Sequence, residues 1–274
     1  MSDPMIFPTD REPSWQECAL FEMNRFYGEH EPGPEDLPRE VGAPFLLKRQ
    51  NARQAILLLH GFLEAPSTLK ETAEALFQQG FTVYVPRLDG HGNTPEALEK
   101  TEVIHWIDTL DRSLSIATSC ASETVVMGVG LGALLALSLA ANRPNQIKGL
   151  ILQHPKGCFG AGSLFQARFL HGWNTIVSAL FLRWFVKSQI KGSPLSQNSL
   201  YDTCPVRAVL SMQRLMKSAQ KGAARIACPT LLLEEQKDNA PSCLKRLPKE
   251  ITSRAPLTNF QELSHNISGW MSTL

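Results

Sequence analysis

An excess of charge of one sign is missing from this sequence, and so is any long basic run. Its 274 residues include 27 lysines and arginines against 26 aspartates and glutamates, which leaves a formal net charge of +1. Proteins that bind nucleic acid through its phosphates concentrate positive charge on one surface. The balanced composition therefore predicts no nucleic-acid partner.

Closely spaced cysteines are missing as well. The six cysteines include no C-x-x-C pair and no Cys/His cluster with the spacing of a zinc site. They are Cys18, Cys120, Cys158, Cys204, Cys228 and Cys243. We expect reduced, mostly buried thiols, no metal site and no cofactor.

The N-terminal residues lack the basic region and apolar stretch of a secretory signal, so a cytoplasmic location is expected. The longest apolar run, residues 125–141, is nearly long enough to span a bilayer. However, Gly128, Gly130 and Gly132 interrupt its first half. A strand, a turn and a helix explain this run better than a transmembrane segment does.

Short apolar runs alternate with helical patterns from residue 54 onward. The apolar runs predict strands at residues 55–59, 81–85, 124–127, 147–152 and 229–233. Apolar residues at helical spacing predict helices over residues 69–77, 106–114 and 131–141. This alternation is typical of the α/β class, with a mainly parallel sheet flanked by helices.

Two regions interrupt the alternation. Residues 1–50 are rich in proline and acidic residues and contain one helical candidate, residues 15–27, so we expect a segment that wraps the surface. Residues 155–225 show no strand pattern and carry a wide band of apolar side chains, which predicts an inserted helical cap. The cap either packs on the sheet or covers an apolar pocket. The core is assigned to residues 51–154 and 226–274.

The segment Gly128-Val129-Gly130-Leu131-Gly132 connects a predicted strand to a predicted helix. It has the spacing of the G-x-S-x-G elbow, in which a sharp turn lifts a nucleophile above the sheet. Glycine occupies the central position here, so the hydroxyl needed for attack is absent. We expect a positive φ at Gly130, although an ordinary glycine-rich turn also fits this segment taken alone.

Other residues complete the pattern around this elbow. His60-Gly61-Phe62 follows the first strong strand, where such folds place a backbone amide of the oxyanion hole. The expected amide donors are those of Phe62 and Leu131. Asp238 and His265 then follow in the chain order elbow, acid, histidine. We expect them to lie within hydrogen-bond reach of each other, with the imidazole directed toward Gly130.

Three segments carry a resemblance to a known family: LLLHGFLEAPSTLKETAEAL, GFTVYVPRLDGHG and HWIDTLDRSL. They are similar to the carboxylesterase, monoacylglycerol lipase and lysophospholipase branch of the bacterial α/β-hydrolases. Weaker similarity in YDTCPVRAVLSMQRL and IACPTLLLEEQKD extends the resemblance over roughly residues 50 to 270. It implies an α/β-hydrolase fold, oxyanion donors at Phe62 and Leu131, a triad acid at Asp238 and a general base at His265.

The chain departs from this family at Gly130, at Glu235 in the acid loop, and in the short tail after His265. Three interpretations follow. The chain is a relative that has lost its nucleophile and binds a small apolar ester or acyl ligand. Alternatively, it is an enzyme that uses the Asp238-His265 pair as a general base, or a serine esterase in which the serine was replaced deliberately.

Overall fold

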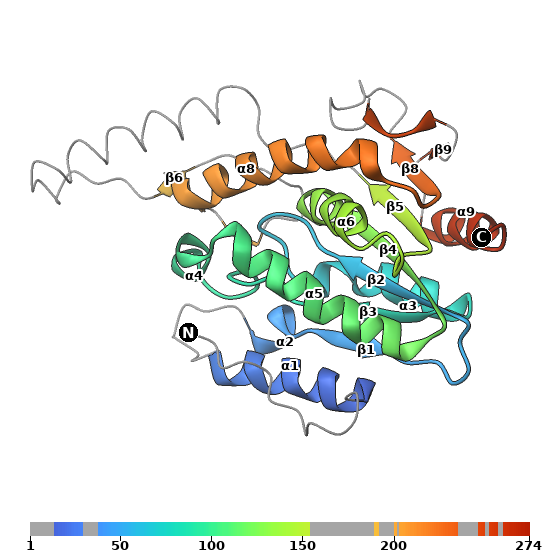
Figure 1. Ribbon diagram of the computed structural model, residues 1–274. Coiled ribbons are helices and arrows are strands. Elements are labelled where there is room, and N and C mark those ends of the chain that lie inside the picture. The colour runs from blue at the N-terminus through green and yellow to red at the C-terminus, as the bar shows by residue number, and fades with distance from the viewer. Residues whose placement is uncertain are drawn as a thin grey trace, which may run out of the picture.

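A seven-stranded sheet forms the centre of the computed structural model (Figure 1). The structure describes residues 14–29, 38–153, 189–191, 200–201, 203–234, 246–249, 252–256 and 260–274. The strand order is β1-β3-β2-β4-β5-β8-β9, and only β1 runs antiparallel to its neighbour. The strands are β1 (Phe45–Leu47), β2 (Gln54–Leu59), β3 (Thr82–Val85), β4 (Glu123–Val129), β5 (Gly149–Gln153), β8 (Thr230–Glu234) and β9 (Thr252–Pro256).

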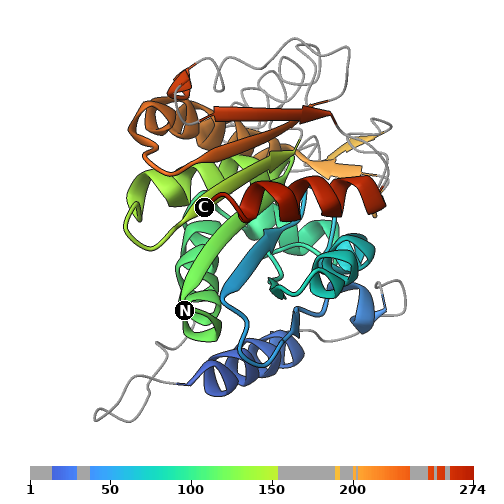
Figure 2. The same cartoon turned by 90° about the vertical axis from the view of Figure 1, so that its right-hand side faces the viewer.

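Helices cover both faces of this sheet, as Figure 2 shows. On one face lie α3 (Lys70–Gln78) and α9 (Phe260–Met271), which also contact each other. On the other face lie α5 (Val103–Cys120), α6 (Leu131–Asn142) and α8 (Val206–Gly222). The shorter elements are α2 (Arg39–Gly42), α4 (Pro95–Lys100), and the 3-10 turns Pro66–Leu69 and Ala223–Arg225.

Alternate side chains of the central strands enter two separate cores. Along β2, Leu57 and Leu59 pack with α5 and α6, whereas Ile56 and Leu58 pack with α3 and α9. Successive side chains of a strand point to opposite faces, and a parallel sheet covered on both faces buries both sets. This is why these strands are continuous apolar runs in the sequence.

The five predicted strands are all present, and four further strands were not predicted. Strand β1 comes from the N-terminal segment, so the sheet begins before residue 51. Strands β6 (Gln189–Lys191) and β7 (Thr203–Pro205) pair with each other inside the stretch expected to lack strands. Three-residue strands are too short to show an alternating pattern. Most of the predicted cap, including residues 155–188, lies outside the described residues.

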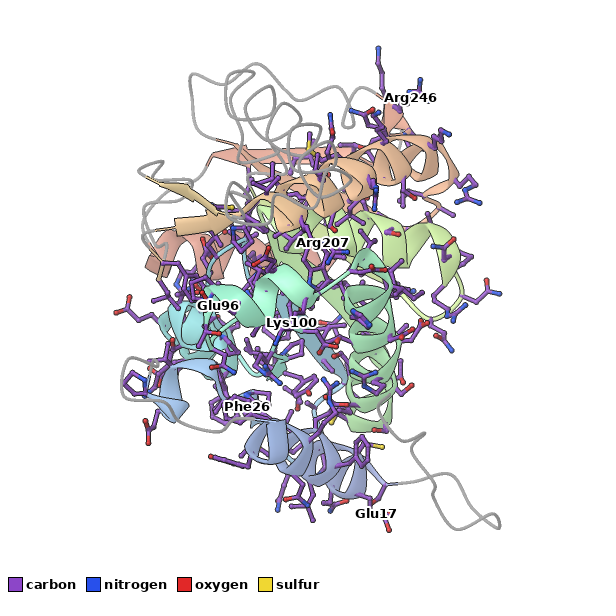
Figure 3. The ribbon with its side chains drawn as sticks, turned by 90° about the vertical axis from the view of Figure 1, so that its left-hand side faces the viewer. Glu17, Phe26, Glu96, Lys100, Arg207 and Arg246 are labelled. Carbon is purple, nitrogen blue, oxygen red and sulfur yellow. The ribbon has the colours of Figure 1, made fainter. Side chains whose placement is uncertain are left out.

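The helix predicted at residues 15–27 is confirmed as α1 (Trp15–Glu29), which packs beside α5. Partly buried ion pairs hold it there: Arg112 Nε lies 2.7 Å from Glu22 Oε1, and Arg25 Nη2 lies 2.8 Å from Asp89 Oδ1. Phe26 points from α1 toward the body of the molecule (Figure 3), where its ring meets the Arg87 guanidinium. Helix α1 is therefore anchored by specific contacts.

Candidate active site at the strand-to-helix elbow

Gly130 forms a sharp turn between the end of β4 and the start of α6. Its backbone angles are φ 54° and ψ −109°, and its amide donates to Gln153 O at the end of β5 over 2.9 Å. A residue with a Cβ adopts such angles at a cost of about 1 to 3 kcal/mol, whereas glycine adopts them freely. The expected positive φ at Gly130 is confirmed.

The two flanking glycines allow three backbone segments to touch. A Cβ on Gly128 would overlap the backbone of Gly132 at the start of α6. A Cβ on Gly132 would overlap the carbonyl of Leu59, where β2 ends. The end of β2, the end of β4 and the start of α6 are therefore in direct backbone contact, and side chains cannot enter between them.

The loop that follows β2 is closed by a turn from Gly61 to Glu64. The amide of Glu64 donates to Gly61 O over 3.4 Å, and the amide of Gly61 donates to Glu64 Oε2 over 2.9 Å. Glu64 is buried, and Leu63 holds a φ of 60° that is unusual for a residue other than glycine. Glu64 was not among the predicted site residues, because its contact with Gly61 depends on the conformation of this turn.

Two buried histidines support the same loop. The amide of Leu88 donates to His60 Nε2 over 3.1 Å, so the ring proton resides on Nδ1, 3.0 Å from Gly61 O. The centroid of the His91 ring lies 5.3 Å from that of His60. Burial, the largest cause, lowers the pKa of His60 to about 3 and that of His91 to about 4. Both rings are therefore neutral near pH 7 and act as structural groups.

The two predicted oxyanion donors lie on the loop after β2 and at the start of α6. Phe62 is fully buried in the loop after β2, and Leu131 is the first residue of α6. The first amides of a helix have no partner within the helix and carry its partial positive charge. An acceptor oxygen above Gly130 would thus face favourable donors, although the role of these two amides remains a prediction.

His265 is not brought to this elbow, which corrects the expectation that its imidazole is directed toward Gly130. It lies within α9, its side chain is exposed, and Gln79 Nε2 donates to its Nδ1 over 3.2 Å. Gln79 directly follows α3, where the chain turns back to enter β3. His265 thus pairs with a residue at the amino-terminal edge of the sheet.

The strand register shows how far this edge lies from the elbow. Thr82 of β3 and Thr124 of β4 are both level with Ala55 of β2. From that level, Gly130 lies about 20 Å further along the strand direction at a rise of roughly 3.3 Å per residue. Gln79 precedes the same level. The spatial separation explains why chain order alone misplaced His265.

Asp238 and Glu235 lie outside the described residues, so the predicted acid and the altered acid loop remain predictions. Within the described ranges, no group of three His, Cys, Asp or Glu side chains could hold a metal ion. Among the helices that the structure describes, none combines the length and the apolar character needed to cross a bilayer.

The sheet order, the two helical layers and the elbow define the class of this protein as an α/β-hydrolase. Residues 50–268 match the model of the family described as serine aminopeptidase, S33, and the chain belongs to this family.

Individual relatives agree with this assignment. The chain is 28% identical over 198 residues to a thermostable monoacylglycerol lipase of Bacillus sp. (strain H-257), covering 69% of this chain and 72% of the relative. It is 22% identical over 200 residues to a carboxylesterase of Bacillus subtilis (strain 168), covering 72% and 76%. A solved structure from work on the metagenome-derived lipolytic enzymes LipS and LipT superposes with a TM-score of 0.68 at 17% identity, covering 87% of this chain and 99% of the other. That last likeness concerns the fold alone.

Proposed function

We propose that this lipase- and esterase-like α/β-hydrolase binds a small apolar ester or acyl ligand at its elbow without cleaving it. The observation that carries the proposal is the elbow itself. Its backbone turn and glycine packing are in place, and the spacing of the elbow pattern predicts that Gly130 takes the place of the nucleophilic serine. Loss of such a nucleophile lowers turnover by about a millionfold.

The C-terminal region supports the same conclusion. Between the end of β9 at Pro256 and the start of α9 at Phe260, the sequence is Leu257, Thr258 and Asn259. None of these can act as a general base at neutral pH. His265 lies on α9 beside Gln79, so among the residues that the structure describes the predicted base does not stand at the elbow, which supports the proposal.

The position of His265 beside Gln79 also bears on the two alternatives, a general-base enzyme and a deliberately altered serine esterase. A general-base enzyme needs its imidazole within hydrogen-bond reach of the reacting proton, and His265 does not reach the elbow. A deliberate replacement of the serine alone would have left the other triad residues in place, and the placement of His265 beside Gln79 does not favour this. The binding interpretation is therefore the best supported of the three.

What remains at the elbow is suited to recognising a carbonyl group. Backbone amides do not depend on a nucleophile, and those of Phe62 and Leu131 belong to the loop and helix that Gly132 holds in contact. We propose that these amides bind the ester or acyl oxygen and that the predicted cap surrounds the apolar part of the ligand. A cytoplasmic location remains part of this proposal.

Monooctanoylglycerol tests the proposal when its binding is followed by calorimetry and release of free acid by pH-stat titration. We expect saturable binding with no release above the buffer rate. Gly130→Tyr places a large side chain at the turn and should abolish this binding, whereas Ile104→Tyr on the exposed surface of α5 should not. Absence of binding would contradict the proposal. Acid release that disappears in His265→Ala would instead establish the general-base enzyme.

A further inference from the structure

Basic side chains line the exposed side of α8, the orange helix of Figure 1. Arg207, Arg214 and Lys221 are seven residues apart, which is just under two helical turns, so they follow one another along the same side of the helix. Lys217 lies beside them, three residues after Arg214. All four side chains are exposed, whereas the opposite side of α8 is buried and contacts α6.

No acidic residue balances these cations within their own stretch of chain. Residues 206–229 contain five basic residues and no aspartate or glutamate. The fifth is Arg225, which is exposed in the 3-10 turn after α8. We call these five residues the basic row: Arg207, Arg214, Lys217, Lys221 and Arg225. Because the whole chain carries a formal net charge of only +1, its remaining residues are net negative. The fold therefore concentrates positive charge along one helix of a nearly neutral protein.

Acidic side chains of neighbouring elements reach only the start of the basic row. Arg207 Nη2 lies 4.0 Å from Glu102 Oε1, just before α5, and both side chains are 64% exposed. The charge of Arg207 also acts on Glu99 of α4. An exposed ion pair of this kind contributes little. In the part of the chain that the structure describes, no hydrogen bond or ion pair holds the other four members of the basic row.

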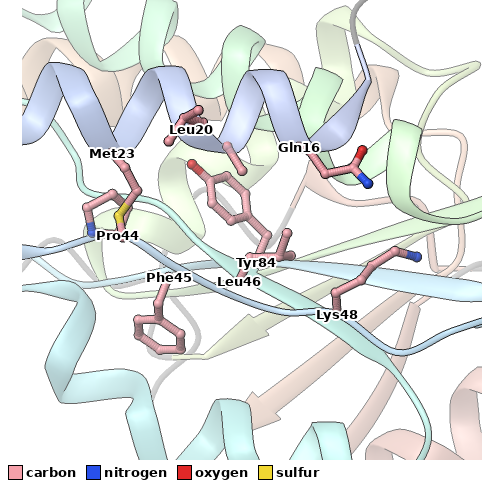
Figure 4. Close-up of a pocket in the computed structure, with 9 residues that line it drawn as sticks. Gln16, Leu20, Met23, Pro44, Phe45, Leu46, Lys48 and Tyr84 are labelled. Carbon is pink, nitrogen blue, oxygen red and sulfur yellow. The ribbon is translucent and has the colours of Figure 1, made fainter.

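Basic side chains near α1 are used differently. Arg112 Nε pairs with Glu22 Oε1 and fastens one side of α1 to α5. The other side of α1 leaves an apolar groove above β1 (Figure 4), and Lys48 at one end of this groove donates to Cys120 O over 2.6 Å. These charges serve contacts within the protein, whereas most of the basic row faces water. The basic row is therefore available to a partner of opposite charge.

The side chains around the basic row favour a lipid surface over a protein partner. Specific protein interfaces have a central region with large apolar or aromatic side chains. The exposed side chains of α8 are its four cations and Ser218, so no such centre is present on this helix. Attraction of basic residues to an anionic bilayer needs charge alone. A straight row of cations on one helix can also meet a flat surface along its whole length.

We propose that the basic row attaches the protein to an anionic phospholipid bilayer by electrostatic attraction, without insertion. The lipid phosphates accept charge-assisted hydrogen bonds from the guanidinium and ammonium groups. This attachment goes beyond the function proposed for the elbow and does not depend on it, because it uses the charge of α8 and no acyl chain. It would also bring the protein to bilayers, where esters with apolar tails collect.

Sedimentation with vesicles of equal parts phosphatidylglycerol and phosphatidylcholine tests the proposal. At about 0.05 M NaCl we expect the protein to sediment with these vesicles and to stay in solution with pure phosphatidylcholine. Both lipids carry the same acyl esters, so binding through the elbow would occur with both. At about 1 M NaCl, where the screening length falls to about 3 Å, the sedimentation should disappear.

Two double variants of equal net charge locate the contact. Arg214→Gln with Lys217→Gln should weaken binding to the mixed vesicles about 25-fold, at roughly fivefold for each cation. Arg53→Gln with Lys70→Gln alters exposed cations of other elements and should bind nearly as tightly as the unaltered protein.

A third variant keeps the charge of the basic row. Arg214→Lys with Lys217→Arg should bind the mixed vesicles as the unaltered protein does, because the attraction depends on charge. Each variant should unfold at the same urea concentration as the unaltered protein, since all these side chains are exposed.

Several results would overturn the proposal. One is the absence of sedimentation with the mixed vesicles, and another is equal sedimentation with pure phosphatidylcholine. Equal weakening in the two charge-neutralising variants would show that net charge, and not the basic row, governs binding. Tighter binding to duplex DNA than to vesicles at the same phosphate concentration would identify nucleic acid as the partner.

Discussion

Two helices that follow strands of this sheet, α6 and α9, differ sharply in how closely their glycines are packed. At the connection from β4 to α6, Gly128 and Gly132 bring backbone atoms into direct contact. In α9, which follows β9, a Cβ on Gly269 would meet nothing within 4 Å, and His265 is exposed. The elbow is therefore maintained by packing whether or not it catalyses, whereas no comparable packing constrains the surface of α9.

The largest effect that would sharpen this contrast is expected at Gly132. Gly132→Ala forces a Cβ into the Leu59 carbonyl and should lower the free energy of unfolding by about 3 kcal/mol or more. Gly269→Ala, the matched change in α9, should raise it by about 0.5 to 1 kcal/mol through helix propensity. Urea unfolding of both variants measures the difference, and equal effects would remove the contrast.

The next effect concerns the buried imidazole of His91. Burial lowers the pKa of this group from 6.5 to about 4 in the folded protein. Between these values the unfolded chain binds a proton that the folded chain does not, so stability falls as the pH drops from 6.5 to 4 and is unaffected above 6.5. His91→Phe should recover about 3 kcal/mol of this loss at pH 4.

The measurement for His91→Phe is urea unfolding at pH 7 and pH 4, compared between variant and unaltered protein. The loss of the contact between His91 Nδ1 and Asp89 O should lower the free energy of unfolding equally at both pH values. If the stability of the variant falls between pH 7 and pH 4 as steeply as that of the unaltered protein, the His91 ring is already protonated in the folded protein at pH 4.

A smaller effect is expected at the elbow itself. Gly130→Ser reintroduces a Cβ at φ 54° and should cost about 1 to 3 kcal/mol, which lowers Tm by several degrees. Because we propose that no base acts at the elbow, we expect no hydrolysis of p-nitrophenyl butyrate above the buffer rate. Esterase activity in the folded Gly130→Ser variant would show that a base does reach this site.

The smallest effect is expected at His265. Its exposed side chain shares one hydrogen bond with Gln79, so His265→Ala should change the free energy of unfolding by less than about 0.5 kcal/mol. Binding of monooctanoylglycerol should also be unchanged. A loss of binding in this variant, measured by the same calorimetric titration, would connect α9 to the elbow.

The sequence predicted most reliably what backbone packing enforces. Continuous apolar runs predicted the central strands, and the glycine spacing predicted the turn at Gly130. Both structures are present. Strand β9, with the sequence TSRAP, was missed because it lacks an apolar run. His265 was misplaced because chain order does not fix spatial order. The groove beside α1 was not predictable, because it depends on which side of that helix the ion pairs hold.

The two edge strands have a consequence for self-association. An edge strand offers unpaired amides and carbonyls to a neighbouring molecule, and prolines and charged side chains oppose such pairing. Strand β1 spans three residues and is bounded by Pro44 and Lys48, while β9 contains Arg254 and ends at Pro256. Both edges thus resist the addition of a further strand. Leu20 and Met23 are exposed to water beside β1. Because β1 resists pairing with a strand of another molecule, these apolar side chains do not lie next to an open sheet edge.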